Sequence, residues 1–351
     1  MSTVPARDAV VLAANRGALA VRLSRRGLLI TVIGWLAALF VAAASLTLGE
    51  FPLSMHEVLD VVAGGGTPID RDVVLGDRLP RAVTGLGVGA AFALSGAILQ
   101  RIARNPLVSP DVIGINSGAA LGALLVITVV GGSGVTLVLS AMAGALLTAA
   151  AILVISYQRG LHGFRLVLVG IGVTAMLTSG ISYLLTRADV HEAMSAAAWL
   201  TGSLANRNSL HVVVIGGTLL TAAPVLAVLA RQLRLLELGD DLAKSLGSRQ
   251  SHRIALVLAA VALAAMATAA AGPIAFVALV APQIARRLLA ERHTGLAPAA
   301  AIGALLVVAA DLVARLVFAP ASMPVGVVTA VLGTPVLLFL LARANRIGSA
   351  G

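Results

Sequence analysis

Long apolar runs separated by short polar breaks occupy most of this chain. A helix needs about 20 predominantly apolar residues to cross roughly 30 Å of hydrocarbon. Runs of about that length predict ten spans, at 28–48, 82–100, 112–131, 136–156, 166–186, 210–230, 254–272, 274–290, 297–317 and 324–342. The eighth run is short and is interrupted by Gly272-Pro273 and Pro282. The pattern therefore predicts an all-α polytopic membrane protein.

Composition supports this interpretation and leaves no room for a separate soluble domain. Hydrophobic residues make up 59% of the 351 positions, charged residues 11%, and the mean hydropathy is +1.01. A water-soluble protein with a core and a polar surface cannot have this composition. We expect a polar, basic tail at 1–27, one transmembrane domain at 28–346, and a short tail at 347–351. Cysteine is absent, which excludes disulfides and thiolate metal sites.

The basic residues predict the orientation of the chain. With ten spans both termini share one side, and 19 of the 25 Lys and Arg residues then fall on that side. Because Lys and Arg accumulate in cytoplasmic loops, both termini are expected in the cytoplasm. The net charge of +10 is explained in this way without a nucleic-acid partner. The six outward bases are Arg71, Arg78, Arg81, Arg187, Arg207 and Arg315.

Three of the outward bases lie at predicted span ends. Arg78 and Arg81 precede the second span, and Arg315 ends the ninth. They either extend to lipid headgroups or form a basic ring that docks an acidic partner. Asp311 is the acid placed well inside a predicted span, which makes it a candidate relay of a proton-coupled secondary transporter. Because Arg315 follows four residues later, a structural ion pair is the preferred interpretation.

The break after the second span carries prolines and polar residues at Asn105, Pro106, Ser109, Pro110 and Asp111. Irregular backbone at membrane depth must be satisfied by protein or by a water-filled cavity. We favour an interfacial loop in which Ser109 or Asp111 caps the third span. Nothing in the spacing names a substrate.

The longest cytoplasmic break between spans is 231–253. Leu235, Leu238, Leu242 and Leu246 recur there at helical spacing, which predicts two short amphipathic helices. Within the same break, Gly239 permits a sharp turn, Asp240 can cap a helix and Gly247 can end it. Such helices lie on the bilayer or fill a groove on another protein, and the two acids favour a protein partner.

No chemistry of its own is visible in the chain, so an enzyme is not expected. It has one lysine, Lys244, and no Gly-x-x-x-x-Gly-Lys-[Ser/Thr] loop to cradle a nucleotide phosphate. The six histidines are scattered, and none belongs to a metal-ligand cluster.

Several motifs, in order, resemble the FecCD-type permeases, the membrane subunits of type II ABC importers for ferric siderophores, haem and cobalamin. The resemblance spans roughly 28–346 and rests on Arg78-Leu79-Pro80-Arg81, Ser95-Gly96-Ala97, Gln100, Asn105-Pro106-Leu107, Pro110, Gly114, Trp199-Leu200-Thr201-Gly202-Ser203-Leu204, Gly272-Pro273 through Pro282, Asp311, Ala314-Arg315, and Pro324 through Pro335.

The resemblance implies partners for this chain. Two permease subunits, identical or homologous, would enclose one path in the bacterial cytoplasmic membrane. Arg78, Arg81 and Arg315 would engage glutamates of a periplasmic or lipid-anchored binding protein. A dimer of ABC ATPase subunits would supply the ATP and Mg²⁺ site, so no cofactor is expected in this chain. A groove of the ATPase subunits would receive part of the 231–253 break, here called the coupling segment. The residues that would enter the groove are Leu235, Leu238, Gly239, Asp240, Leu242, Ala243, Leu246 and Gly247.

The resemblance also implies an inert path for a bulky chelate. Small residues of the fifth span would line it, at Gly170, Gly172, Thr174, Thr178, Ser179 and Gly180, although small residues equally permit close helix packing. Ala278 and Gln283 depart from the family, which often has Gly and His there. The 105–114 and Trp199 segments look closest to ferric-siderophore members, so we expect that cargo rather than haem or cobalamin. A membrane-embedded subunit without transport is the remaining alternative.

Overall fold

The computed structural model describes residues 9–14, 19–132, 134–157, 163–289, 295–317 and 323–348. Parts of the expected tails at 1–27 and 347–351 lie outside this part of the chain. The described residues are helical apart from one antiparallel hairpin, in which β1 (Ala9–Ala14) pairs with β2 (Leu19–Ser24). The predicted helical fold is confirmed, with this hairpin as an addition near the N-terminus.

Each of the ten predicted spans coincides with a helix. Seven helices of the described chain are long and apolar enough to cross a membrane. They are α1 (Arg25–Thr47), α4 (Leu79–Ala103), which continues a helix from Pro68, α7 (Val135–Ser156), α8 (Gly163–Arg187), α10 (Ser209–Leu236), α12 (Gln250–Ala271) and α14 (Leu296–Leu316).

The other three predicted spans contain helices with shorter apolar stretches. These are α6 (Ile115–Leu125) with the π-helical turn η3 (Val126–Val130), α13 (Val277–Leu289), and α15 (Val325–Gly348). The helix formed by α6 and η3 and the first part of α15 are apolar, whereas α13 carries Arg286 and Arg287 in its last turn. The eighth predicted span was expected to begin at 274, but α13 is only 13 residues long. The chain before it is irregular because Gly272 and Phe276 both adopt positive φ, +76° and +67°.

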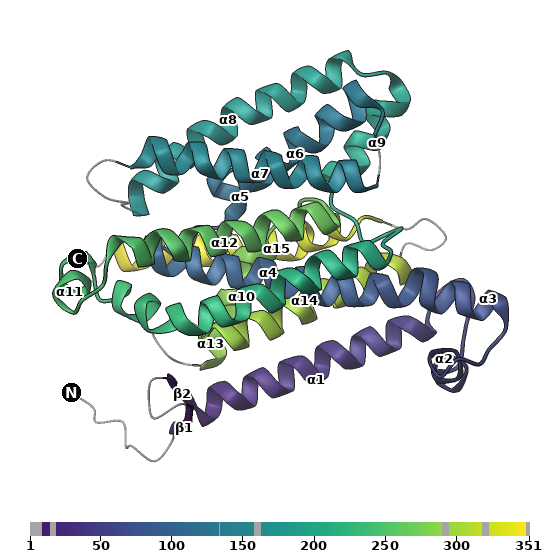
Figure 1. Ribbon diagram of the computed structural model, residues 1–351, viewed down its shortest axis with the longest axis horizontal. Coiled ribbons are helices and arrows are strands. Elements are labelled where there is room, and N and C mark those ends of the chain that lie inside the picture. Colours follow the sequence, from purple (N-terminus) through teal and green to yellow (C-terminus); the bar gives the residue numbers. More distant parts are fainter. Residues whose placement is uncertain are drawn as a thin grey trace.

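Short elements lie between the long helices: α2 (Met55–Val62), α3 (Pro68–Arg71), the π-helical η2 (Asp72–Arg78), α5 (Pro110–Ile113), α9 (Val190–Leu200) and α11 (Asp240–Ser245). In Figure 1 the start of α1 and α11 lie at one end of the bundle, while α2, α3 and α9 lie at the other. This arrangement agrees with the orientation predicted from the basic residues. We call these ends the inner and the outer end.

Helix α4 lies at the centre of the bundle and contacts α10, α12, α13 and α14 (Figure 1). Its small residues explain these close contacts. A Cβ added to Gly89 would lie 2.2 Å from the carbonyl oxygen of Gly303 in α14, and one added to Gly96 would lie 1.7 Å from that of Ala278 in α13. Glycine therefore lets the backbones meet, as is usual between membrane helices.

The peripheral helices expose large apolar side chains. Helix α8 illustrates this, because Phe164 is 82% and Met176 is 68% exposed. Similar side chains are exposed on α1, α7 and α10. Such faces suit hydrocarbon, so the fold is that of a multi-pass membrane protein.

Candidate docking and coupling sites

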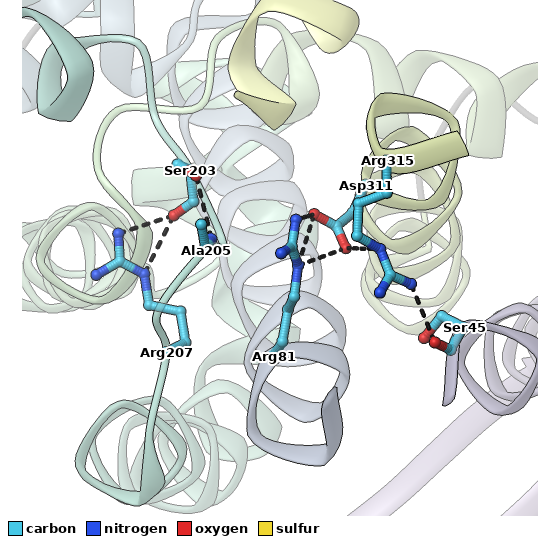
Figure 2. Close-up of polar contacts among 7 residues, drawn as sticks. All are labelled: Ser45, Arg81, Ser203, Ala205, Arg207, Asp311 and Arg315. Carbon is cyan, nitrogen blue, oxygen red and sulfur yellow. Dashed lines mark hydrogen bonds and ion pairs between the residues drawn. The ribbon is translucent and has the colours of Figure 1, made fainter. Parts of the chain in front are cut away.

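A buried ion pair joins α4 to α14 near the outer end (Figure 2). Arg81 Nη2 lies 2.8 Å from Asp311 Oδ1, and Arg81 Nε lies 3.0 Å from Asp311 Oδ2. The two side chains are only 10% and 7% exposed. Paired N–H donors on one carboxylate form a strong and geometrically specific contact.

Arg315 is the second partner of Asp311. Its Nε lies 3.7 Å from Asp311 Oδ2, which confirms the predicted i,i+4 pair. Its Nη2 also donates to the carbonyl oxygen of Ser45 at 3.0 Å (Figure 2). Arg81 is nevertheless the closer partner, and its place 230 positions away in the chain could not be read from the sequence.

Arg78 donates hydrogen bonds to backbone carbonyl groups at and just after the C-terminus of α1. Its Nη1 donates to Leu46 O at 2.7 Å and its Nη2 to Phe51 O at 2.6 Å. Carbonyls at a helix C-terminus have no partner within the helix, and a guanidinium is well suited to bond them. Arg78, Arg81 and Arg315 thus join α1, α4 and α14 through contacts within the chain.

The same three arginines line one outer cavity of about 530 Å³. Three exposed acids, Glu50, Asp72 and Asp77, line it as well. The structure therefore brings the arginines predicted for docking together at one opening. It also adds acids that the sequence interpretation did not connect with them.

Arg207 extends the basic cluster from the loop between α9 and α10. Its Nε and Nη2 donate to Ser203 O at 3.1 and 2.8 Å (Figure 2). Burial, and secondarily the charge of Arg81, lowers the pKa of Arg207 to about 10. Arg207 therefore remains charged at neutral pH. The sequence placed it among the outward bases but gave no sign of its position beside Arg81.

At the inner end, the coupling segment follows α10 directly. Leu238, Leu242 and Leu246 are 51%, 58% and 54% exposed, whereas Ala243 is buried and the half-buried Leu235 packs on the core. The segment expected to form two short helices has one, α11, because α10 continues to Leu236. Gly239 and Gly247 adopt positive φ, +108° and +86°, and so turn the chain before and after α11. Asp240 is the first residue of α11 and not its cap as expected, because Gly239 occupies the N-cap position.

The Asn105-Pro106-Leu107 break follows α4 in the chain and is hydrogen-bonded to α13. Asn105 Oδ1 accepts a hydrogen bond from Leu107 N at 3.0 Å. Pro106 O accepts one from Gln283 Nε2 at 3.2 Å, and the same amide group donates to Gln100. Gln283, where the resemblance left the role open, therefore fastens the loop to two helices.

Helix α5 re-enters the bundle between this break and α6. Ser109 caps α5 by accepting from Val112 N, and Pro110 occupies the first turn of α5. The expectation that Ser109 or Asp111 caps the third span is wrong, because α5 intervenes and α6 begins after Gly114. Asp111 instead accepts from Asn116 Nδ2, and Asn116 Oδ1 accepts from Thr268 of α12 at 2.8 Å. Gly114 ends α5 at φ +93°, close to Thr174.

The four residues expected along the path divide into two pairs. Gly170 packs against Ile113, and Thr174 is half-buried with its hydroxyl donating to Gly170 O at 2.8 Å. Thr178 and Ser179 are exposed on the face of α8 that no other helix of the described chain covers. A Cβ added to Gly172 would have no neighbour within 4 Å. Packing therefore accounts for the first pair, while the second pair is accessible.

Within the residues that the structure describes, no group of three or more His, Cys, Asp or Glu residues could hold a metal ion.

Comparison with known proteins gives a consistent result. The model of the FecCD transport family matches residues 36–343. The chain is 41% identical over 323 residues to the ferric enterobactin transport system permease protein FepG of Escherichia coli (strain K12), covering 92% of this chain and 98% of that protein. It is 39% identical over 334 residues to the iron(3+)-hydroxamate import system permease protein FhuG of Bacillus subtilis (strain 168), covering 92% and 99%.

A solved structure supports the fold. An inward-facing conformation of a putative metal-chelate type ABC transporter superimposes with a TM-score of 0.78 at 31% identity, covering 90% of this chain and 99% of that chain. This agreement confirms the predicted type II ABC importer permease fold. The chain belongs to the FecCD transport family.

Proposed function

We propose that this chain is the permease subunit of an ATP-driven ABC importer for ferric siderophores in a bacterial cytoplasmic membrane. The relatives support this cargo, because their names refer to ferric enterobactin, iron(3+)-hydroxamate and achromobactin. The permease takes the chelate from an external binding protein and releases it to the cytoplasm. Because its sequence contains no P-loop, we assign ATP hydrolysis to a separate subunit.

The exposed leucines of the coupling segment carry this proposal. Leu238, Leu242 and Leu246 are more than half exposed at the inner end, beyond the apolar spans. Leu242 lies in α11 and the other two flank it. A cluster of exposed leucines in and beside a short helix is typical of a surface that fills a groove on a partner protein. The partner is an ABC ATPase dimer, which supplies ATP and Mg²⁺ and whose closure displaces α11.

The outer cavity is the proposed docking site for the binding protein. Arg78, Arg81 and Arg315 all line it, so carboxylates of the two lobes of the binding protein meet guanidinium groups there. Contacts of this kind orient a partner and speed its encounter more than they increase affinity. Glu50, Asp72 and Asp77 oppose an acidic partner at the same opening and therefore moderate the encounter.

A second permease subunit, identical or homologous, completes the path. The exposed face of α8 with Thr178 and Ser179 is the proposed lining, since hydroxyl groups and small side chains pass a bulky chelate without binding it tightly. The apolar faces of the other peripheral helices contact membrane lipids. Alternating access follows when the ATPase subunits close and reopen.

The secondary-transporter alternative is weakened by the contacts of Asp311. A proton relay requires a carboxyl group that gains and loses a proton, but Asp311 lies between Arg81 and Arg315. Both guanidinium groups hold its carboxylate in place, and the pair with Arg81 joins α14 to α4. A structural ion pair is therefore the better interpretation.

Reconstitution tests the proposed function directly. The permease, the ATPase and the loaded binding protein are combined in proteoliposomes, and uptake of a radiolabelled ferric siderophore is measured with ATP or with a non-hydrolysable analogue. We expect uptake with ATP and no uptake with the non-hydrolysable analogue. Undiminished uptake driven by a proton gradient, with no ATPase present, would contradict the proposal.

A further inference from the structure

A second buried ion pair lies at the inner end, apart from the docking and coupling surfaces. Arg101 in the last turn of α4 places its Nε 2.8 Å from Oε1 of Glu237, the residue that directly follows α10. The side chains are 11% and 10% exposed. A buried pair of this kind is hard to separate, because each charge left alone in a poorly solvated site is strongly unfavourable.

The position of Glu237 gives this pair its significance. Glu237 lies three residues before α11, and Gly239 turns the chain between them with φ +108°. Gly239 itself lies beside the guanidinium of Arg104, since a Cβ there would be 3.3 Å from Arg104 Nη1. The base of the coupling segment is thus held against the end of α4, while the exposed leucines face away from it.

Helix α4 connects this point to the rest of the bundle. Arg253 of α12 donates to Ile102 O at 3.3 Å, and Gln100 is joined to Gln283 of α13. At the outer end of the same helix, Arg81 holds Asp311 of α14. Because 19 of the 25 residues of α4 are buried, the helix has little room to bend independently of its neighbours.

We propose that the Arg101–Glu237 ion pair transmits the displacement of α11 to α4, so that ATPase closure moves the helix that carries Arg81 at its outer end. Arg101 and Glu237 are positioning residues, and neither contacts cargo or nucleotide. This inference rests on the proposed function, because it assumes that the ATPase grips α11. Two other connections join α11 to the bundle: the packing of Ala243 on the core, which is small and not directional, and the backbone of 237–239, which contains the conformationally permissive Gly239.

The test uses the complete transporter in proteoliposomes with three variants. Glu237→Gln removes the charge and keeps the size of the side chain. Arg101→Glu with Glu237→Arg reverses the pair. Arg231→Gln is the matched control, because Arg231 is an exposed base near the same end of α10. Binding of the ATPase, ATP hydrolysis and siderophore uptake are measured on each preparation.

We expect Glu237→Gln to bind the ATPase and to hydrolyse ATP as the unmodified complex does, while uptake per ATP falls about tenfold, a typical size for a coupling between two sites. The reversed pair should restore most of this ratio, and Arg231→Gln should leave it unchanged. A purely structural role would lower assembly, hydrolysis and uptake together. Three outcomes would overturn the inference. The first is this joint loss, the second is an unchanged uptake per ATP in Glu237→Gln, and the third is a loss that the reversed pair does not restore.

The unmodified complex separates this inference from the proposed function. If the unmodified permease does not bind the ATPase or shows no ATP-dependent uptake, the proposed function fails. If unmodified uptake is normal and Glu237→Gln is fully coupled, the proposed function stands and the role of the ion pair fails.

Discussion

Asp311 illustrates what can be predicted about a single residue. Helical spacing indicates Arg315 as a partner, because residues four apart share a face, and the pair is present at 3.7 Å. The stronger partner, Arg81 at 2.8 Å, comes from a helix far away in the sequence. Gln283 is a similar case, since its contacts with Gln100 and Pro106 depend on how three segments meet. Periodicity defines a face of one helix but not the neighbour that covers it.

At this scale we predict that Asp311→Asn destabilises the protein by about 3 to 5 kcal/mol, because it leaves Arg81 buried without a counter-charge. Thermal and denaturant unfolding in detergent measures the change in the free energy of unfolding. Glu50→Gln is the control, since it neutralises an exposed acid at the same end and should change stability by no more than about 0.5 kcal/mol. Equal effects of the two substitutions would show that the ion pair is not a structural contact.

Helix α11 shows the corresponding limit for whole elements. The leucine spacing at 235–246 correctly indicates helix, but it treats four leucines as one face. Because α10 continues to Leu236, Leu235 packs on the core and the other three face outward. A continuous helix and two short helices have the same local periodicity, so the position of the break at Gly239 decides which leucines are exposed.

We therefore predict that Leu242→Asp with Leu246→Asp abolishes binding of the ATPase while the permease remains folded. Burial of each leucine contributes about 1.5 to 3 kcal/mol, so losing both should raise the dissociation constant at least about 100-fold. Co-purification and a binding titration measure the loss. Lys244→Gln, on the exposed surface of the same helix, is the control. Co-purification of the double variant at the normal stoichiometry would place the ATPase elsewhere.

Packing between elements gives another prediction. Gly89→Ala should destabilise the protein by about 1 to 3 kcal/mol, because its Cβ would lie 2.2 Å from a backbone oxygen of α14. Gly216→Ala is the matched control, since a Cβ on that glycine of α10 meets nothing within 4 Å. The control should be neutral or stabilising by up to about 1 kcal/mol. Unfolding midpoints in detergent compare the two, and equal midpoints would contradict a close α4 to α14 contact.

At the scale of the molecule, α4 links the two functional ends (Figure 1). Arg81 in its first turn and Arg78, which directly precedes it in η2, line the outer cavity, and its inner end carries Arg101 beside the coupling segment. The segment between the first two spans contributes acids to the same outer cavity, at Glu50, Asp72 and Asp77. The proposed docking site therefore combines attraction and repulsion, and its effective charge depends on all six residues.

This combination predicts the effect of removing the acids. Glu50→Gln, Asp72→Asn and Asp77→Asn together should raise the association rate of the binding protein about tenfold at low salt, with a smaller gain at high salt. Stopped-flow or surface-binding kinetics at several ionic strengths measure this rate. Lys244→Gln at the inner end should have no effect. An association rate that the triple substitution leaves unchanged at every salt concentration would argue against docking at this cavity.

The sequence by itself determined the class of protein, the approximate spans, the orientation and the family. These follow from hydropathy, from the distribution of charge and from short motifs, all of which are local properties of the chain. Tertiary structure decided which residues act together: Arg81 with Asp311, Arg101 with Glu237, and Gln283 with the Asn-Pro-Leu break. In a chain with this much Ala, Leu and Gly, many helix pairings have similar local patterns. Close packing at glycines and the burial of a few charges select one arrangement among them.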